Sequence, residues 1–144
     1  MGFRGTVRYA SIGCHTQQEQ CRKDDVEGWL YTLVELTRGL LPWRNTQEAE
    51  EVGHLIFLSC ILPSPKYSFQ VCNFKRRVRR PENYNQLFAG CPVQYAEIMR
   101  QVDTLTYYDR PDYTAIYALL RRAMIANRLQ EFPYDWEPRN QRNL

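Results

Sequence analysis

The side chains in this 144-residue sequence that could carry chemistry are five cysteines, two histidines and a run of basic residues. The cysteines include no C-x-x-C pair, and neither His15 nor His54 lies at a zinc-like spacing from them. We therefore interpret the cysteines as scattered reduced thiols and expect no metal site. The sequence places no partner serine or cysteine for His15 as a general base, so we expect it to form hydrogen bonds within a loop.

The basic run occupies residues 75–80, in which every residue except Val78 is lysine or arginine. Clustered positive charge can contact phosphate groups of nucleic acids or serve as a nuclear-import patch. No interleaved aromatic residues and no DNA-reading helix accompany the run, so we favour the solvated end of a helix. The net charge of +3 for the whole chain does not by itself indicate nucleic acid.

The stretch that must position much of the chain is residues 22–43, which we expect to form one buried helix. Asp24 and Asp25 lie where an N-cap and first turn use acidic oxygens, and Gly39 and Pro42 end the pattern. Its apolar residues cover more than one face, so protein is expected on several sides. These residues are Val26, Trp29, Leu30, Leu33, Val34 and Leu36.

The remaining pattern predicts a mainly α chain with little strand signal. Residues 2–15 have no helical period and are expected to be a loop, with an extended piece at 6–9. A short surface helix is expected at 44–52. Two longer helices follow Pro92 and Asp112, and their expected inner faces carry apolar residues at helical spacing. These residues are Tyr95, Ile98, Met99, Val102 and Leu105 in the first, and Tyr113, Ile116, Tyr117, Leu120, Ala123 and Met124 in the second.

Residues 53–70 differ from the rest of the chain because Lys66 is their only charged residue. Their apolar core at 55–62 is much shorter than the roughly 20 residues that span a bilayer. No signal-peptide pattern opens the sequence, so the expected compartment is the cytoplasm or the nucleus, with no membrane partner.

Two long motifs carry a resemblance to a known family. FRGTVRYAS at 3–11 and RKDDVEGWLYTLVELTRGLLPW at 22–43 resemble the C-terminal lobe of casein kinase I-type serine/threonine kinases, closest to the tau-tubulin kinase-like branch. PDYTAIYALLR and FPYDWE are similar to the closing helices of the family. The resemblance implies a partial kinase domain at 1–137, with the N-terminal lobe and catalytic loop absent, and a frayed tail at 138–144.

The resemblance also implies roles for individual residues. Asp25 matches the aspartate that hydrogen-bonds the catalytic-loop backbone, and Trp43 belongs to the turn that closes this scaffold helix. Arg8 matches an arginine that binds an anion or a substrate phosphate, although its second basic partner has no clear counterpart. The substrate-binding wall would be formed by Gly5, Thr6, Val7, Arg8 and Tyr9.

The turn after this wall departs from the family pattern. Residues 11–15 read S-I-G-C-H, where the family has S-[IV]-N-x-H, so Gly13 replaces an asparagine. The hydrogen bonds of this turn are therefore expected to differ from those of the family.

The motifs that bind and transfer phosphate are missing from the sequence. It contains no G-x-G-x-x-G, H-R-D or D-F-G string. A complete parent would use ATP and Mg²⁺ to phosphorylate protein serine or threonine. This chain alone is expected to bind neither, and to supply substrate docking and a scaffold. One alternative is a non-catalytic, pseudokinase-like module that binds a protein partner, and a weaker one is a basic helical nucleic-acid binder.

A second consequence concerns stability and the origin of 53–70. In a whole kinase of this family, the catalytic loop and a neighbouring helix cover the helix at 22–43. Without them it is expected to expose several apolar side chains, each losing roughly 1.5–3 kcal/mol of burial.

Joining Gly53 to Val71 restores the family pattern from EEVG into the basic run. We therefore hypothesise that 53–70 is an insertion or a retained intron.

Overall fold

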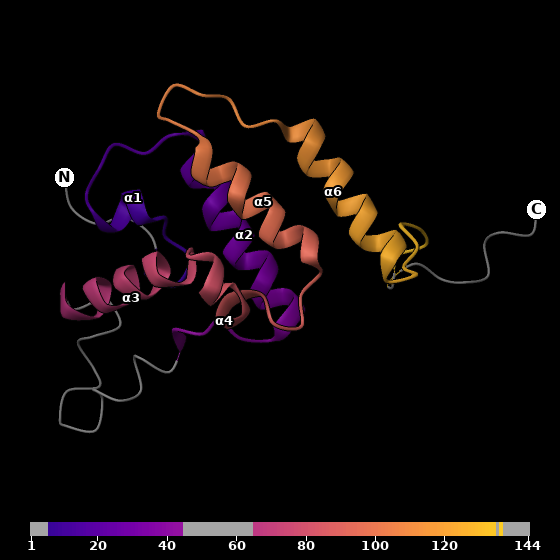
Figure 1. The fold of residues 1–144 in the computed structure, drawn as a ribbon, viewed down its shortest axis with the longest axis horizontal. Helices are drawn as coiled ribbons and strands as arrows, with labels where there is room; N and C mark the ends of the chain where they lie inside the picture. Colours follow the sequence, from indigo (N-terminus) through magenta and orange to yellow (C-terminus); the bar gives the residue numbers. More distant parts are fainter. Residues whose placement is uncertain (1–5, 45–64, 135, 137–144) are drawn as a thin grey trace, which may run out of the picture.

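The computed structural model describes residues 6–44, 65–134 and 136, and every regular element among them is helical (Figure 1). The fold class predicted from the sequence, mainly α, is therefore confirmed. In chain order the elements are α1 (Ile12–His15), α2 (Arg22–Arg38), α3 (Pro65–Val78), η2 (Pro81–Asn83), α4 (Tyr84–Phe88), α5 (Val93–Thr104) and α6 (Tyr113–Ala126).

Helix α2 is central to the arrangement. α5 packs along it, α6 packs on the other side of α5, and α3 lies across one end beside α1 and α4 (Figure 1). The core therefore forms where α2, α3 and α5 meet. Its fully buried members include Leu30, Tyr31, Val34, Trp43, Val71, Val78, Ile98 and Met99.

The ends of α2 have clear local causes. The cap residue is Cys21, not Asp24 or Asp25, and its backbone N–H donates to the Asp24 carboxylate at 2.9 Å. The prediction of an acidic first turn is confirmed, but the prediction of an acidic cap was wrong. At the other end Gly39 has φ +82°, and its N–H donates to the Glu35 carbonyl at 2.7 Å.

The N-terminal segment differs from its prediction. Residues 6–10 form a tight turn instead of an extended piece, because the N–H groups of Tyr9 and Ala10 both donate to the Thr6 carbonyl at 3.1 Å. Ser11 then caps α1 by accepting from the Cys14 N–H at 3.0 Å. The loop predicted for 2–15 therefore contains one helical turn.

The two late helices follow their predicted patterns closely. Tyr95, Ile98, Met99 and Val102 of α5 are buried, and the Asp112 side chain caps α6 by accepting from the Ala115 N–H. The predicted inner face of α6 is partly wrong, because Tyr113 and Tyr117 are exposed, whereas Leu119, which was not predicted, is buried.

Several predictions concern the middle of the chain and its tail. The helix predicted at 44–52, apart from Arg44, and the tail at 138–144 lie outside the described residues. So does the first part of the suspected insertion, 53–64. Residues 65–70 are the first turns of α3 and continue without interruption into 71–78. The insertion stays a hypothesis.

One face of α2 carries uncovered apolar side chains. Trp29 and Leu36 are seven residues apart, which places them on one side of the helix, and Leu36 is 79% exposed. Leu40, which follows the end of the helix, is exposed as well. The prediction that the helix exposes apolar surface is confirmed. None of the described helices is both long and apolar enough to cross a membrane.

Candidate functional site

The 6–10 turn, which contains four of the five predicted substrate-binding residues, is the centre of the candidate site. Thr6 is exposed, Val7 is buried in the core, and Arg8 and Tyr9 are half-buried. Gly5 lies outside the described residues. The turn therefore presents Thr6 to solvent while Val7 anchors it to the core.

Side chains from distant parts of the chain hold the carbonyl groups of this turn. The Trp43 indole N–H donates to the Arg8 carbonyl at 2.9 Å. The Lys75 ammonium donates to the carbonyls of Val7 at 2.9 Å and Ala10 at 2.6 Å. Because buried carbonyls need partners, these three bonds replace the regular backbone pairing that a tight turn lacks.

Lys75 is fully buried, which is rare for a lysine. Its nitrogen lies 4.8 Å from the centre of the Tyr31 ring and 5.1 Å from that of Trp43, where aromatic faces attract a cation. Burial lowers the pKa of Lys75 to about 7, although the charge of Glu27 acts in the opposite direction. Below that pH the buried group is an ammonium ion.

His15 connects Lys75 to the start of α3. Its Nε2 lies 3.1 Å from the Lys75 nitrogen, and its Nδ1 lies 2.9 Å from the Ser68 hydroxyl. Burial and the neighbouring Lys75 charge lower the pKa of His15 to about 4, so the ring is neutral near pH 6. An ammonium ion can only donate, so Nε2 is the acceptor and Nδ1–H donates to Ser68.

This arrangement corrects one prediction and confirms another. His15 does form hydrogen bonds, as predicted, but a serine partner is present, 53 positions along the chain. With Nε2 engaged by a cation, the ring cannot take a proton from that serine. The trio of Ser68, His15 and Lys75 therefore connects α3 to the N-terminal segment and is not a nucleophile with its base.

Arg8 and Tyr9 share one carboxylate on α2. Arg8 Nη1 lies 3.5 Å from Glu35 Oε1, and the Tyr9 hydroxyl donates to Glu35 Oε2. The guanidinium of Arg8 is about one-third exposed, so it can still meet a ligand. An anion approaching Arg8 would compete with Glu35, which the resemblance alone did not indicate.

A second polar cluster joins four helices, α1, α2, α3 and α5. Glu27 of α2 accepts from the Ile12 N–H at 2.8 Å and from the Tyr31 hydroxyl at 2.9 Å, and pairs with Arg79 at 2.6 Å. Arg79 of α3 also pairs with Asp103 of α5. The two carboxylates compensate the charge of Arg79, although its Nε is buried without a hydrogen-bond partner among the described residues.

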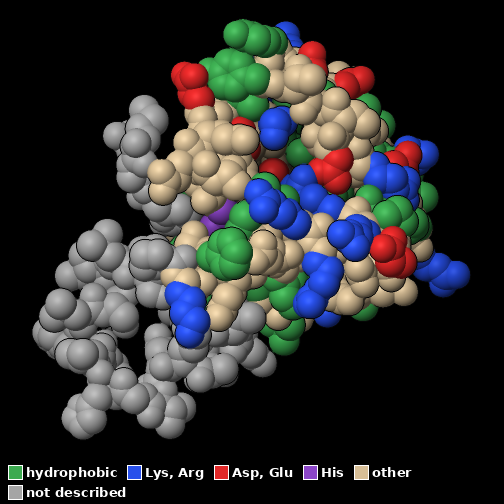
Figure 2. Space-filling view, turned by 60° about the vertical axis from the view of Figure 1, so that its left-hand side comes forward, with side chains coloured by type: hydrophobic (Ala, Val, Ile, Leu, Met, Phe, Trp, Pro, Cys, Tyr) green, Lys and Arg blue, Asp and Glu red, His purple; other side chains and the backbone are tan. Residues whose placement is uncertain are grey.

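The basic run at 75–80 is therefore not simply a solvated helix end. Lys75 is buried and Arg79 is mostly enclosed, whereas Arg76, Arg77 and Arg80 are exposed. Figure 2 shows acidic side chains among the basic ones on this face, so the positive charge is not continuous. This mixture weakens the nucleic-acid interpretation.

The two predicted scaffold residues differ in their surroundings. Trp43 is fully buried, whereas Asp25 is exposed and has no hydrogen bond or ion pair among the described residues. Its neighbour Asp24 has one buried oxygen, Oδ1, without a hydrogen-bond partner in this part of the chain. A Cβ at Gly13 would come within 2.7 Å of that oxygen, so glycine leaves room for the carboxylate.

The sequence interpretation missed Lys75, Ser68 and Glu35 as parts of the site. A signal for Lys75 was present, because Val71, Lys75 and Val78 are spaced by four and three residues and so share a helical face. Both valines are fully buried, and Lys75, which lies between them on the same face, is fully buried as well. The described residues contain no group of three His, Cys, Asp or Glu side chains arranged for a metal.

Comparison with known proteins shows which proteins the chain is similar to. No family model matches the chain. It is 31% identical over 137 residues to a probable serine/threonine-protein kinase of Dictyostelium discoideum, covering 94% of this chain and 23% of that protein. It is 32% identical over 134 residues to the serine/threonine-protein kinase spe-6 of Caenorhabditis elegans, covering 92% and 31%.

A third similar protein comes from a plant. The chain is 32% identical over 117 residues to the casein kinase 1-like protein HD16 of Oryza sativa, covering 81% of this chain and 14% of that protein. The chain thus spans less than a third of the length of these three relatives. The regular elements of the described residues are all helical, which agrees with the helical C-terminal lobe of a kinase. The chain is therefore similar, over nearly its whole length, to a short part of serine/threonine kinases that include the casein kinase 1-like proteins.

Proposed function

We propose that this chain is the substrate-docking and scaffold part of a casein kinase I-like protein serine/threonine kinase. The 6–10 turn would contact the protein substrate, with Gly5, Thr6, Val7, Arg8 and Tyr9 forming its wall. The observation that carries this proposal is the fixation of the turn carbonyls by Trp43 and Lys75. A fixed turn loses little conformational freedom when a peptide binds.

The chain alone would not transfer phosphate, because its sequence lacks the motifs that hold nucleotide and metal. In a complete kinase, ATP and Mg²⁺ would be held by other segments. The exposed Asp25 would then accept backbone N–H groups of the catalytic loop. The exposed apolar side chains of Trp29 and Leu36 would be covered by the same part of the enzyme.

The docking role is tested by peptide binding to the purified full chain. The probe is a fluorescein-labelled peptide with one serine among glutamates, followed by fluorescence anisotropy at pH 6. Arg8→Gln is expected to weaken binding about fivefold to tenfold, because one charge-assisted contact is removed. Arg128→Gln, which removes an exposed arginine after α6, is the control. Equal affinities of the wild type and Arg8→Gln would contradict the proposal.

The second candidate is a non-catalytic module that binds a protein partner. The observation that favours it is the uncovered apolar face of α2 in a chain without catalytic motifs. The effect of Mg-ATP on thermal stability distinguishes the two proposed functions. A chain joined to the remaining kinase segments should be stabilised against heat by Mg-ATP, whereas an interaction module should show no such shift.

A further inference from the structure

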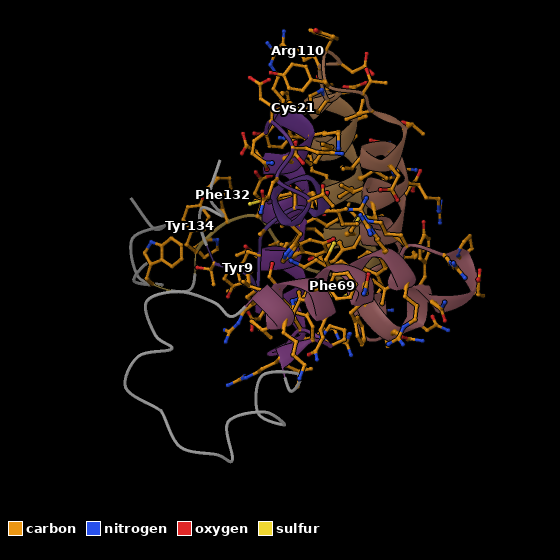
Figure 3. All side chains as sticks on the ribbon, turned by 90° about the vertical axis from the view of Figure 1, so that its left-hand side faces the viewer. Tyr9, Cys21, Phe69, Arg110, Phe132 and Tyr134 are labelled. Carbon is orange, nitrogen blue, oxygen red and sulfur yellow. The ribbon has the colours of Figure 1, made fainter. Side chains whose placement is uncertain are left out.

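We propose that Lys75 is the positioning residue that fixes the 6–10 turn in the conformation that docks a protein substrate. The inference rests on the proposed docking function, and it adds a residue outside the wall itself. Lys75 lies on α3, more than sixty positions from the turn. Figure 3 shows the labelled Tyr9 of the turn at the same end of the molecule as Phe69 of α3, away from Cys21 at the start of α2.

The hydrogen-bond capacity of Lys75 is fully used. An ammonium group has three N–H donors, and three acceptors surround it: the Val7 carbonyl, the Ala10 carbonyl and Nε2 of His15. Two of the three belong to the turn. The third belongs to α1, which follows the turn directly. Lys75 thus holds both the second and the last residue of the 6–10 turn.

The side chain has little freedom to adopt another position. It is fully buried, and the rings of Tyr31 and Trp43 flank its nitrogen. Trp43 also donates to the Arg8 carbonyl between the two Lys75 contacts. Removing the ammonium would leave the Val7 and Ala10 carbonyls without their donor, so the turn would have to move to find water.

A neighbouring charged residue provides a matched comparison. Arg79 lies one helical turn beyond Lys75 on α3 and is also largely enclosed, but it binds Glu27, Tyr31 and Asp103 and does not touch the turn. Arg79→Met should therefore lower stability without moving residues 7–10. A loss of docking caused only by weaker packing would appear in both variants, whereas a positioning role predicts it for Lys75 alone.

The experiment uses the full chain at pH 6, where Lys75 is charged and His15 is neutral. Backbone amide shifts and hydrogen exchange of residues 7–10 are compared among the wild type, Lys75→Met and Arg79→Met. Lys75→Met is expected to shift these amides and speed their exchange, and Arg79→Met is expected to leave their shifts unchanged. The serine-glutamate peptide should bind Lys75→Met about fivefold to tenfold more weakly than Arg79→Met.

The outcomes separate this inference from the proposed function. Unchanged turn amides in Lys75→Met would overturn the positioning role whatever the peptide does. Shifted amides with no peptide binding by the wild type would overturn the docking role and leave Lys75 only as an anchor of the turn. If Lys75→Met does not fold, the inference is tested in the wild type by NMR couplings through the hydrogen bonds, from the Lys75 ammonium to the Val7 and Ala10 carbonyl carbons. Their absence would overturn the inference.

Discussion

The ammonium nitrogen of Lys75 lies 3.1 Å from Nε2 of His15, which joins two ionisable groups in the interior of a small helical protein. Both pKa values are lowered, chiefly because burial disfavours the charged form of each base. The charge of Lys75 lowers the pKa of His15 further, and the charge of Arg79 lowers that of Lys75. Between pH 4 and pH 7 the favoured state is a charged lysine beside a neutral histidine. In this state the charged lysine donates to the carbonyl groups of Val7 and Ala10.

The first prediction concerns the dependence of stability on pH. His15 has a pKa of about 4 in the folded chain and 6.5 in the unfolded chain, so the unfolded state binds more protons between these values. The contribution of His15 to the free energy of unfolding therefore rises as pH increases from 4 to 6.5, and is complete above 6.5. Charging His15 below this window opposes Lys75 and Arg76, which face it from α3.

His15→Gln tests this prediction, because its amide oxygen can accept from Lys75 but does not titrate. Urea unfolding of both proteins from pH 4 to pH 7 gives the difference in their free energies of unfolding. We expect the wild type to gain stability relative to His15→Gln across the window. Parallel curves would show that His15 does not titrate in contact with Lys75.

The second prediction concerns the indole N–H of Trp43. Trp43→Phe keeps a buried aromatic ring but leaves the Arg8 carbonyl without its donor. An unsatisfied buried carbonyl costs about 1–3 kcal/mol, so the free energy of unfolding should fall by at least this amount. Trp29→Phe serves as the control, since Trp29 is 39% exposed and should cost less than about 1 kcal/mol. Equal losses in the two variants would contradict a specific role for the Trp43 bond.

Helix α5 shows what could be predicted from the sequence alone. Tyr95, Ile98, Met99 and Val102 follow helical spacing and are buried as expected, whereas Leu105, the fifth predicted residue, caps the end of the helix and is half-buried. The pattern suffices because a helix buries one continuous face against its neighbours. The start of α6 was also predicted, since Asp112 is a strong cap before an apolar pattern.

The candidate site could be predicted only in part. Its wall residues came from a family resemblance, but the partners of Val7 and Ala10 come from a lysine 68 and 65 positions away. No local period encodes such a contact, because it depends on how α3 crosses the end of α2. The interpretation of residues 75–80 as a solvated helix end failed for the same reason. Lys75 and Arg79 are basic like their neighbours, but they lie on the side of α3 that faces the interior.

The third prediction concerns the ion pair between Glu27 and Arg79. Glu27→Gln leaves Arg79 largely enclosed with Asp103 as its remaining carboxylate partner. Breaking one partner of a buried pair typically costs about 3–5 kcal/mol. We expect the loss of unfolding free energy to lie near the lower end of this range, because Asp103 still compensates part of the charge of Arg79. Chemical denaturation measures it, with Glu97→Gln as the control.

The control removes an ion pair on the surface. Glu97 and Arg122 lie 3.7 Å apart and both are exposed, so Glu97→Gln should change stability by less than about 1 kcal/mol. The double variant Glu27→Gln with Arg79→Met should lose less than the sum of the single losses, because it leaves no uncompensated charge. Additive losses would mean that the two side chains do not act as a pair.

The fourth prediction concerns the apolar face of α2. Leu36 is 79% exposed, so Leu36→Ser should change the free energy of unfolding of this chain by only about 0.5 kcal/mol, whereas Leu30→Ala in the core should cost about 2–5 kcal/mol. Binding of the dye ANS should fall in Leu36→Ser, because the dye reports exposed apolar surface.

The same substitution has a different consequence if the face is covered in a longer protein. When this chain is joined to the remaining segments of a kinase, burial of Leu36 would make Leu36→Ser cost about 1.5–3 kcal/mol. The difference between the losses of unfolding free energy in the chain alone and in the joined protein measures how far the kinase segments bury Leu36. A small loss in both would mean that the kinase segments do not pack on this face and that its apolar surface serves another partner.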